Sequence, residues 1–340
     1  MPDPHSMPTN VAARRCGFNF QWIFSWREGA APQPPDPAAL DFMAHFGLNF
    51  ARIPADYRFW TKDFRYFAPD ETVFGYLDQY LAACRQRNIQ MCLNLHRAPG
   101  YCVNRNELER HNLWVDREAQ DAFVFLWETF ARRYRGVPGE ALSFNLLNEP
   151  PHVGRCELTR ENHAEVMRRS TAAIRAIDPQ REIVIDGLAC GGEAIPELAD
   201  LGAVHSGRGY QPMPVTHYQA SWWAGSQGLP PPVYPGTPWA GRAWDKSALL
   251  DFYRPWREVE QSGVRVHIGE FGCFNKTPND VALRWYRDVI SIYRGFGWGY
   301  ALWNFKGAFG IVEHGREGAR WELIHGFRVD RELLDLFLAR

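Results

Sequence analysis

The segment TVFGYLDQYLAACRQRNIQMCLNLH, residues 72–96, decides how this chain is expected to fold. Its first part, 72–88, places apolar residues three and four positions apart, as an amphipathic helix requires. Its second part, IQMCLNLH at 89–96, is a short, nearly continuous apolar run, which is typical of a buried strand. Only a short return at Arg87 and Asn88 joins the two. The segment therefore predicts a helix followed by a strand of a covered sheet.

The same unit recurs along the chain, with helical segments such as 118–136 between apolar runs. The runs are CGFNF (16–20), LNFARIP (48–54), IQMCLNLH (89–96), ALSFNLLNE (141–149), REIVIDG (181–187), PVTHY (214–218), VRVHIGE (264–270) and WGYALWN (298–304). Eight alternating strands and helices predict an α/β protein with a closed parallel barrel, the (β/α)8 or TIM barrel. The doubly wound alternative normally shows a glycine-rich phosphate turn, and neither GxGxxG nor GxxxxGK[ST] occurs.

The predicted barrel forms one domain, residues 14–340, after an N-terminal tail at 1–13. The longest connections all follow strands, at 20–36, 97–117, 219–246 and 304–327. Active sites of such barrels lie at the carboxyl ends of the strands, where these loops would meet. We therefore expect function at this end.

Composition narrows the classes of partner. The net charge of -1 and the absence of a basic run argue against nucleic acid, and no segment is apolar enough to enter a membrane. Residues 1–15 contain no signal-peptide core and the seven cysteines form no CxxC pair, so we expect reduced thiols and a cytoplasmic monomer; a chain trimmed of its leader would look the same. Aromatic residues reach 14%, including 14 Trp, which favours surfaces that stack on sugars.

The predicted strand ends are strongly polar. They are Arg52, His96, Asn148, Glu149, His217, Tyr218, Glu270 and Trp303. Two carboxylates on different strands of one pocket match the cleavage of a glycosidic bond, in which one protonates the leaving oxygen and the other attacks or stabilises the anomeric carbon. In FNLLNEPP, residues 144–151, Pro150 stops the strand and is expected to keep Glu149 extended.

At these positions the chain resembles a known family, the cellulase-like glycoside hydrolase family 5, in the clan of retaining β-glycosidase barrels. The resemblance rests on GFNF (17–20), ARIP (51–54), LNLHRAPGY (93–101), FNLLNEP (144–150), THY (216–218), HIGEFG (267–272) and ALWN (301–304), which occur in the family's order. It covers nearly the whole chain and implies a β-glycosidase that needs no metal or cofactor.

Carried over residue by residue, the resemblance implies that Glu149 is the general acid/base and Glu270 the nucleophile of a retaining double displacement. Such a pair stands about 5 Å apart, with the acid protonated at rest. Asn148 would bind the sugar 2-hydroxyl, and Arg52 would keep Glu270 ionised and aimed. Trp303 would lie under the sugar that is cleaved.

Further residues have less defined roles. His96 and His217 would contact sugar hydroxyls or orient the carboxylates. The family commonly shows His, any residue, then Tyr after strand six, with that Tyr bonding the nucleophile; here the order is His217-Tyr218-Gln219, so either Tyr218 or Gln219 takes this part. Tryptophans in the loops after strands one and six could form sugar platforms or merely pack the loops: Trp22, Trp26, Trp222, Trp223 and Trp239.

Three alternatives remain at this stage. A metal-dependent barrel hydrolase is disfavoured because no HxH or HExxH occurs. A barrel that binds sugar without cleaving it is disfavoured because both glutamates are present. The substrate stays open among β-linked oligosaccharides, polysaccharides and glycoconjugates: endoglucanase-like action on β-glucan is our first expectation, beside exo-acting β-glucosidase, β-1,3-glucanase, β-mannanase or mannosidase, and glycolipid glycosidase.

Overall fold

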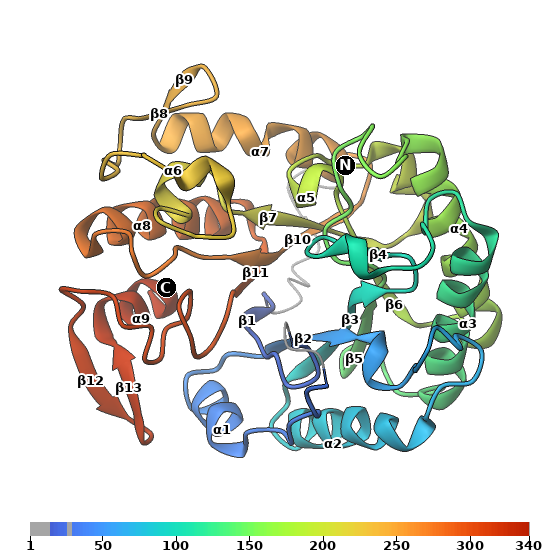
Figure 1. Cartoon of the computed structure of the whole chain (residues 1–340). Coiled ribbons are helices and arrows are strands. Elements are labelled where there is room, and N and C mark those ends of the chain that lie inside the picture. Colours follow the sequence, from blue (N-terminus) through green and yellow to red (C-terminus); the bar gives the residue numbers. More distant parts are fainter. Residues whose placement is uncertain (1–13, 26–28, 340) are drawn as a thin grey trace, which may run out of the picture.

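The computed structural model of the chain describes residues 14–25 and 29–339, so the predicted tail at 1–13 lies outside the described residues. Eight parallel strands form the centre of the molecule, and helices surround them (Figure 1). These strands are β1 (Cys16–Asn19), β2 (Phe50–Asp56), β3 (Gln90–Ala98), β5 (Leu142–Asn145), β6 (Glu182–Asp186), β7 (Val204–Gly209), β10 (Arg265–Phe271) and β11 (Gly299–Leu302).

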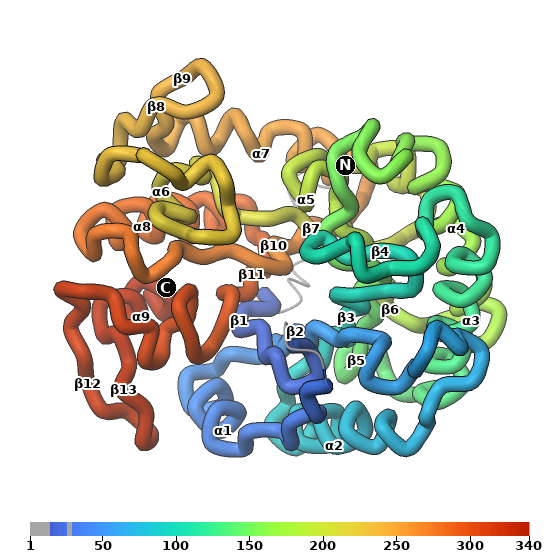
Figure 2. Tube along the Cα trace, viewed as in Figure 1, coloured from blue at the N-terminus to red at the C-terminus, as the bar shows by residue number. Residues whose placement is uncertain are grey.

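The sheet closes on itself. Each barrel strand pairs in parallel with the next along the chain, and β1 pairs with β2 on one side and with β11 on the other. The first and last strands of the barrel, β1 and β11, therefore lie side by side, as the blue and red parts of the trace show (Figure 2). The single-domain (β/α)8 barrel predicted from the sequence is confirmed.

Amphipathic helices cover the outside of the barrel. They are α1 (Pro37–His45), α2 (Phe74–Arg85), α3 (Arg117–Arg133), α4 (Arg160–Ile177), α7 (Lys246–Glu260), α8 (Asn279–Phe296) and α9 (Arg331–Leu338). Short polar side chains fix where several of them begin: Thr159 and Asn162 form a capping box on α4, and Asp245 accepts from the Ala248 amide at the start of α7. Each helix presents an apolar face to the strands, which buries the core.

Smaller elements lie mainly in the connections. They are β4 (Tyr101–Cys102), the pairs β8 (Thr237–Trp239) with β9 (Arg242–Trp244) and β12 (Trp321–Ile324) with β13 (Phe327–Asp330), the short helices α5 (Leu188–Gly191) and α6 (Met213–Thr216), and 3-10 turns at Tyr57–Phe59, Glu71–Val73, Asn106–Leu108, Pro196–Leu201 and Ala224–Ser226. The predicted long connections at 20–36, 97–117 and 304–327 follow β1, β3 and β11, whereas the predicted loop at 219–246 follows α6 rather than a strand.

The sixth barrel strand differs from the prediction. The segment PVTHY at 214–218 falls on α6 and the residues after it, and β7 takes the sixth place. Its sequence, VHSGRG, is poor in apolar residues because neighbours come close: a Cβ on Gly209 would lie 2.1 Å from the hydroxyl of Tyr293, and one on Gly207 would lie 3.2 Å from Ile268. Because glycines make room for these side chains, the strand lacks the apolar run from which a buried strand is predicted.

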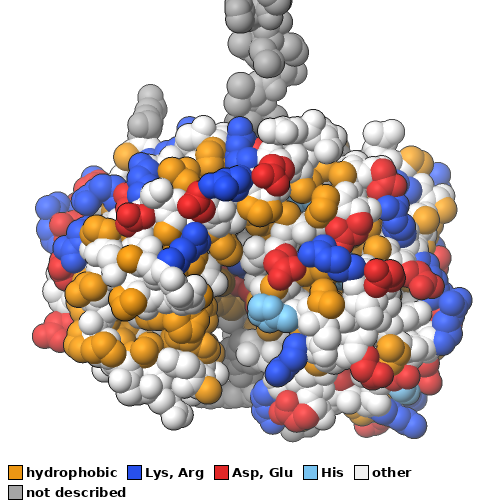
Figure 3. Space-filling model, turned by 90° about the horizontal axis from the view of Figure 1, so that it is seen from above, with side chains coloured by type: hydrophobic (Ala, Val, Ile, Leu, Met, Phe, Trp, Pro, Cys, Tyr) orange, Lys and Arg blue, Asp and Glu red, His pale blue; other side chains and the backbone are white. Residues whose placement is uncertain are grey.

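Hydrophobic side chains also gather on the outer surface. In Figure 3 they lie at the lower left, over the part of the molecule where Figure 1 places α6, β8 and β9. Trp222 is 56% exposed and Val233 58% exposed in this segment. Within the described ranges, the model contains no helix that is both long and apolar enough to span a bilayer.

Candidate active site

The two glutamates singled out in the sequence come together at the carboxyl end of the barrel. Glu270 is the penultimate residue of β10, and Glu149 follows β5 by four residues. Their side chains are 4% and 14% exposed, respectively. The Arg208 guanidinium lies between them, with Nε 3.0 Å from Glu149 Oε1 and Nη2 3.5 Å from Glu270 Oε1. A single cation therefore links the two carboxyl groups.

Glu270 is held from two sides. Arg52, which the structure places as the third residue of β2 rather than at the predicted strand end, donates to Glu270 Oε1, and the hydroxyl of Tyr210, directly after β7, donates to Oε2 at 3.1 Å. Burial and the charge of Glu270 raise the pKa of Tyr210 well above its usual value, so the phenol stays protonated and can donate. These donors fix the direction of the Glu270 carboxyl group.

Arg52 is itself fixed by three asparagines. Its Nε donates to Asn145, Nη1 to Asn19 and Nη2 to Asn148, each at 2.9 Å. The asparagines lie on or just after β1 and β5, so the guanidinium connects β2 with its neighbour β1 and with β5, two strands away. With its donors divided among acceptors in different directions, the group cannot rotate away from Glu270.

Asp186, the last residue of β6, completes the network on the side of Glu149. Its carboxylate accepts from Arg208 Nη2, from Asn145 Nδ2 at 2.9 Å and from the Glu149 amide at 3.0 Å. Arg208 Nη2 also donates to Asn148 Oδ1 at 2.9 Å. Asp186 thus neutralises the guanidinium that faces Glu149 and anchors the backbone of Glu149 itself.

The backbone at Glu149 differs from the extended form predicted before Pro150. Its φ is +48°, in the left-handed region, which is rare for a residue with a side chain. The hydrogen bond from the Glu149 backbone amide to the Asp186 carboxylate holds this conformation. The Glu149 carbonyl also accepts from the Tyr101 hydroxyl at 2.6 Å. The Pro150 carbonyl in turn accepts from the Cys190 amide at 2.8 Å. The turn, rather than a straight strand end, directs the carboxyl group into the site.

The two glutamates have different electrostatic surroundings. Burial and, second, the charge of Glu270 raise the pKa of Glu149 to about 8, against the opposing effect of Arg208. With Glu149 protonated, the two guanidinium charges of Arg52 and Arg208 balance the carboxylates of Glu270 and Asp186. The resting site is therefore arranged as one carboxylic acid beside one carboxylate.

His96 and Trp303 form one wall of the site. Their rings stack with centroids 5.4 Å apart, and His96 Nε2 lies 3.4 Å from Asn148 Nδ2. Burial, reinforced by Arg52 and Arg208, lowers the pKa of His96 well below its usual value, so the ring is neutral at physiological pH. Trp303 is half-buried at the end of β11. Both residues lie where the sequence predicted.

Tyr218 does not take the position expected for it. Its buried hydroxyl accepts from Gln219 Nε2 at 3.2 Å, and Tyr210 is the tyrosine that bonds Glu270. The error follows from the misplaced strand, since β7 ends eight residues before His217. His217 nevertheless lies close to the site, with its ring 5.3 Å from that of Tyr210. Burial lowers the pKa of His217 to about 4.

The expected tryptophan platforms divide into three groups. Trp22 packs against Phe20 and Tyr80, at 4.5 and 5.1 Å between ring centroids, and belongs to the edge of the core. Trp26 lies outside the described residues. The ring centroids of Trp222 and Trp223 lie 6.3 and 6.1 Å from that of His217, and Trp222 is the more exposed; Trp239 in β8 packs against Trp223, at 5.6 Å between ring centroids. The accessible indoles are therefore those of the loop after β7.

The sequence reasoning missed Asp186, Arg208 and Tyr210. Asp186 had a visible signal, because it ends an apolar run just as Glu270 does. Arg208 and Tyr210 were hidden with the glycine-rich strand. In the observed strand the order is Arg208-Gly209-Tyr210, so an arginine occupies the place where the family commonly has histidine. Within residues 14–25 and 29–339, no three His, Cys, Asp or Glu side chains are grouped as a metal site.

This combination of a closed parallel barrel with paired glutamates in unequal surroundings defines a barrel glycosidase. The model of the cellulase family, glycosyl hydrolase family 5, matches residues 11–308, and the chain belongs to that family of O-glycosyl hydrolases. Its endoglucanase-like character agrees with the sequence prediction.

Comparisons with individual proteins agree with this assignment. Endoglucanase C of Acetivibrio thermocellus is 27% identical over 311 residues, which cover 84% of this chain and 88% of that protein. A crystal structure of a glycoside hydrolase is 64% identical, with a TM-score of 0.94 over 96% of this chain and 98% of the other. Endoglucanase Cel5A of Thermotoga maritima is 22% identical, with a TM-score of 0.75 over 96% and 97%, and supports the fold.

Proposed function

We propose that this protein hydrolyses internal β-1,4-glucosidic bonds of glucan chains or gluco-oligosaccharides with retention of anomeric configuration, as a monomer whose own chain supplies the complete site. The observation behind the proposal is the unequal pair: a largely buried Glu149 with its pKa raised to about 8, and Glu270 held by Arg52 and Tyr210. Arg208 touches both.

In the first step, Glu270 attacks the anomeric carbon while Glu149 gives its proton to the leaving oxygen. The bond from C1 to the leaving oxygen breaks, and an ester forms between C1 and Glu270. Arg52 and Tyr210 hold the attacking carboxylate in line. Because Glu149 is protonated up to about pH 8, the acid is available throughout the neutral range.

In the second step, Glu149 takes a proton from water, which attacks C1 and releases Glu270. Esterification removes the charge of Glu270, which is one of the causes that raise the pKa of Glu149. Arg208, 3.0 Å from Glu149 in the resting site, also lowers that pKa. The same carboxyl group is thereby converted from acid to base between the two steps.

The sugar contacts follow from the walls of the site. Asn148 would bond the 2-hydroxyl, His96 and His217 would bond further hydroxyls, and the half-buried face of Trp303 would support the ring. The choice of β-glucan is supported by family membership and by the likeness to Endoglucanase C. Trp222 and Trp223 in the loop after β7 would receive neighbouring sugar units.

The test is a product analysis on matched oligosaccharide panels. Purified protein is incubated with β-1,4-gluco-, β-1,3-gluco- and β-1,4-manno-oligosaccharides, and the anomer released first is followed by proton NMR. We expect cleavage of internal bonds in the β-1,4-gluco series, with the β-anomer formed before mutarotation. Initial release of the α-anomer would contradict the double displacement, and faster cleavage of a different series would reassign the substrate.

A further inference from the structure

One short backbone segment at the end of β7 carries a contact to each of the two glutamates. Arg208 Nε lies 3.0 Å from Glu149 Oε1. The hydroxyl of Tyr210 donates to Glu270 Oε2 at 3.1 Å. Only Gly209 separates Arg208 from Tyr210, and side chains two positions apart leave a strand on the same face. The position of this segment therefore sets both contacts.

Side chains from the outer helices bond the backbone of this segment, residues 208–211, which we call the β7 exit. The Tyr253 hydroxyl on α7 donates to the Arg208 carbonyl at 3.2 Å. Trp285 Nε1 on α8 donates to the Gln211 carbonyl at 2.8 Å. Both aromatic side chains are buried, so water does not compete for these bonds. The β7 exit is thus held at its first and last carbonyl from behind the barrel.

A second buried tyrosine supports the bond to the Arg208 carbonyl. The hydroxyls of Tyr253 and Tyr293 lie 2.8 Å apart, and burial raises the pKa of both, so both are protonated. Because Tyr253 gives its single proton to the Arg208 carbonyl, Tyr293 is the donor to Tyr253. Gly209 permits this approach, since a Cβ there would lie 2.1 Å from the Tyr293 hydroxyl. The two tyrosines form a hydrogen-bonded chain that ends on the backbone of Arg208.

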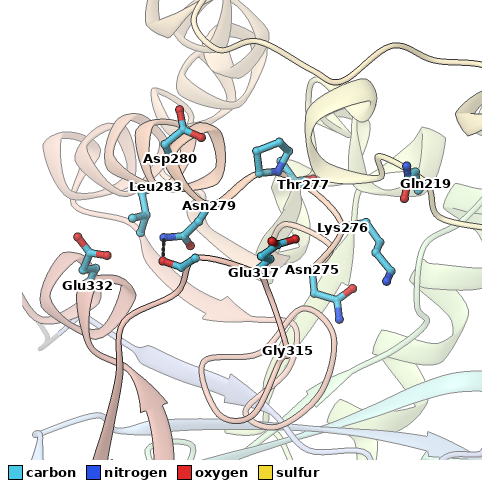
Figure 4. A pocket seen from close by; sticks show the side chains of 12 residues that line it. Gln219, Asn275, Lys276, Thr277, Asn279, Asp280, Leu283, Gly315, Glu317 and Glu332 are labelled. Atoms are coloured by element: carbon cyan, nitrogen blue, oxygen red, sulfur yellow. Dashed lines mark hydrogen bonds between the residues drawn. The ribbon is translucent and has the colours of Figure 1, made fainter.

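The helix α8, which supplies two of these aromatic residues, is fixed at its start. Thr277 Oγ1, two residues before α8, donates to the Val215 carbonyl in α6 at 2.6 Å. Asn279 Nδ2, on the first residue of α8, donates to the Gly318 carbonyl at 3.2 Å, and Figure 4 shows this bond at the edge of a pocket. These contacts tie α8 to the segments that follow β7 and β11, so its donors come from a fixed support.

The alternative is that these aromatic residues only fill the space between the strands and the helices. The outward positions near the end of β7 are Gly207 and Gly209, which have no side chain with which to hold the strand against the helices. The bonds from Tyr253 and Trp285 therefore take the place of packing as the restraint on the β7 exit. They fall on and beside the residues that contact the glutamates, which favours a role in the reaction.

We propose that Tyr253, with Tyr293 and Trp285, is a positioning residue of this enzyme, which fixes the β7 exit so that its arginine and its tyrosine reach the two glutamates. This inference rests on the roles of the glutamates in the proposed function. The three aromatic residues lie behind the strand and do not touch the sugar. Their loss should therefore change kcat and its pH dependence more than KM.

The first experiment removes one hydroxyl. In Tyr253→Phe, assayed on an aryl β-cellobioside, we expect kcat to fall about three- to fivefold and KM to stay within about twofold. Arg208 lowers the pKa of Glu149, so a less firmly held guanidinium should move the alkaline limb of kcat/KM up by about half a pH unit. Tyr293→Phe leaves the bond from Tyr253 to the backbone in place, and its effects should be smaller in the same direction.

Tyr134→Phe is the matched control. Tyr134 is also buried, and its hydroxyl donates to Asp78 at 2.9 Å. It follows α3 and precedes β5, so it lies at the end of the barrel opposite the site. Its Tm should fall by about as much as that of Tyr253→Phe, while kcat and the alkaline limb stay those of the parent. A role in folding alone would give this same result in Tyr253→Phe.

A second experiment asks whether Tyr253 acts through the arginine. In protein that carries Arg208→Gln and Asp186→Asn no guanidinium is left to hold, so adding Tyr253→Phe should not move the alkaline limb further. An equal further shift there, an equal shift in Tyr134→Phe, or a parental kcat and limb in Tyr253→Phe would overturn the positioning role while hydrolysis stands. A parent that cleaves neither the aryl glycoside nor cello-oligosaccharides would instead overturn the proposed function, and the inference with it.

Discussion

The turn after β5 and the end of β10 each place one glutamate in the site, but they surround it differently. Glu149 has one guanidinium neighbour, Arg208, and a pKa raised to about 8. Glu270 accepts from Arg52 and Tyr210 and also lies 3.5 Å from Arg208. The comparison teaches that the role of each carboxyl group is set by the donors around it, because the side chains themselves are identical.

The largest effects on activity are expected when the carboxyl group of each glutamate is removed in turn, which tests the different roles of the two residues. We expect Glu270→Ala to lower kcat by about 10⁴-fold or more, because no bond to C1 can form. Glu149→Ala should cost about 10²- to 10⁴-fold and regain rate with azide on aryl glycosides that have good leaving groups, since azide can then attack the intermediate from the vacated side. Rescue of both variants to β-glycosyl azide would contradict the assigned roles.

The next largest effect is expected at Arg52. In Arg52→Lys the ammonium group cannot serve Asn19, Asn145 and Asn148 and still aim Glu270, so kcat should fall about 10²-fold or more. Circular dichroism and Tm, measured beside activity, separate this from a loss of fold. A variant with normal kcat would show that orientation of Glu270 does not depend on the guanidinium.

A double change at Arg208→Gln and Asp186→Asn tests the other glutamate while the charge stays balanced. Arg208 lowers the pKa of Glu149 more than Asp186 raises it, so removing both should raise that pKa. The alkaline limb of kcat/KM, set near pH 8 by loss of the acid's proton, should then move to higher pH.

In the same variant kcat should fall between about 10- and 100-fold, because a more basic Glu149 is harder to deprotonate for the second step. The pH profiles of kcat/KM and kcat, with a fast-leaving aryl glycoside for kcat, provide the measurement. A shift of the alkaline limb to lower pH would show that Asp186, not Arg208, dominates the acid.

The smallest effect is expected from a test of which tyrosine, Tyr210 or Tyr218, holds Glu270. Tyr210→Phe removes the 3.1 Å bond to Glu270 Oε2, and we expect kcat to fall about tenfold. Tyr218→Phe is the matched control, because its hydroxyl accepts from Gln219 instead; kcat should stay within about twofold. The reverse order of effects would restore the prediction made from the sequence.

Much of the fold followed from patterns that the strands share. Seven of the predicted strand segments overlap barrel strands, since a strand covered on both sides must be apolar almost throughout. The sixth barrel strand was not predicted, because it has glycines at 207 and 209 that leave space for Ile268 and Tyr293. A side chain from elsewhere in the chain fills that part of the core, and no local pattern records it.

The site was predictable where a motif placed one functional group at one strand end, as for Glu149 and Glu270. It was not predictable where function depends on side chains that meet across strands. Arg208 and Asp186 are 22 positions apart and become partners only when β6 and β7 pair. The left-handed φ of Glu149 also depends on a contact across strands, because the hydrogen bond from its backbone amide to Asp186 supports it.

The ion pair between Arg208 and Asp186 also limits how these two positions can change in evolution. Both side chains are buried, so a change of either alone would leave an uncompensated charge against Glu149 or Glu270 and cost several kcal/mol, about 3–5 for a broken buried pair. A lineage could exchange them only nearly together, or through a neutral intermediate at one position. We therefore expect the arginine at the end of β7 and the aspartate at the end of β6 to be inherited as a unit, and to mark a branch of the family by their joint presence.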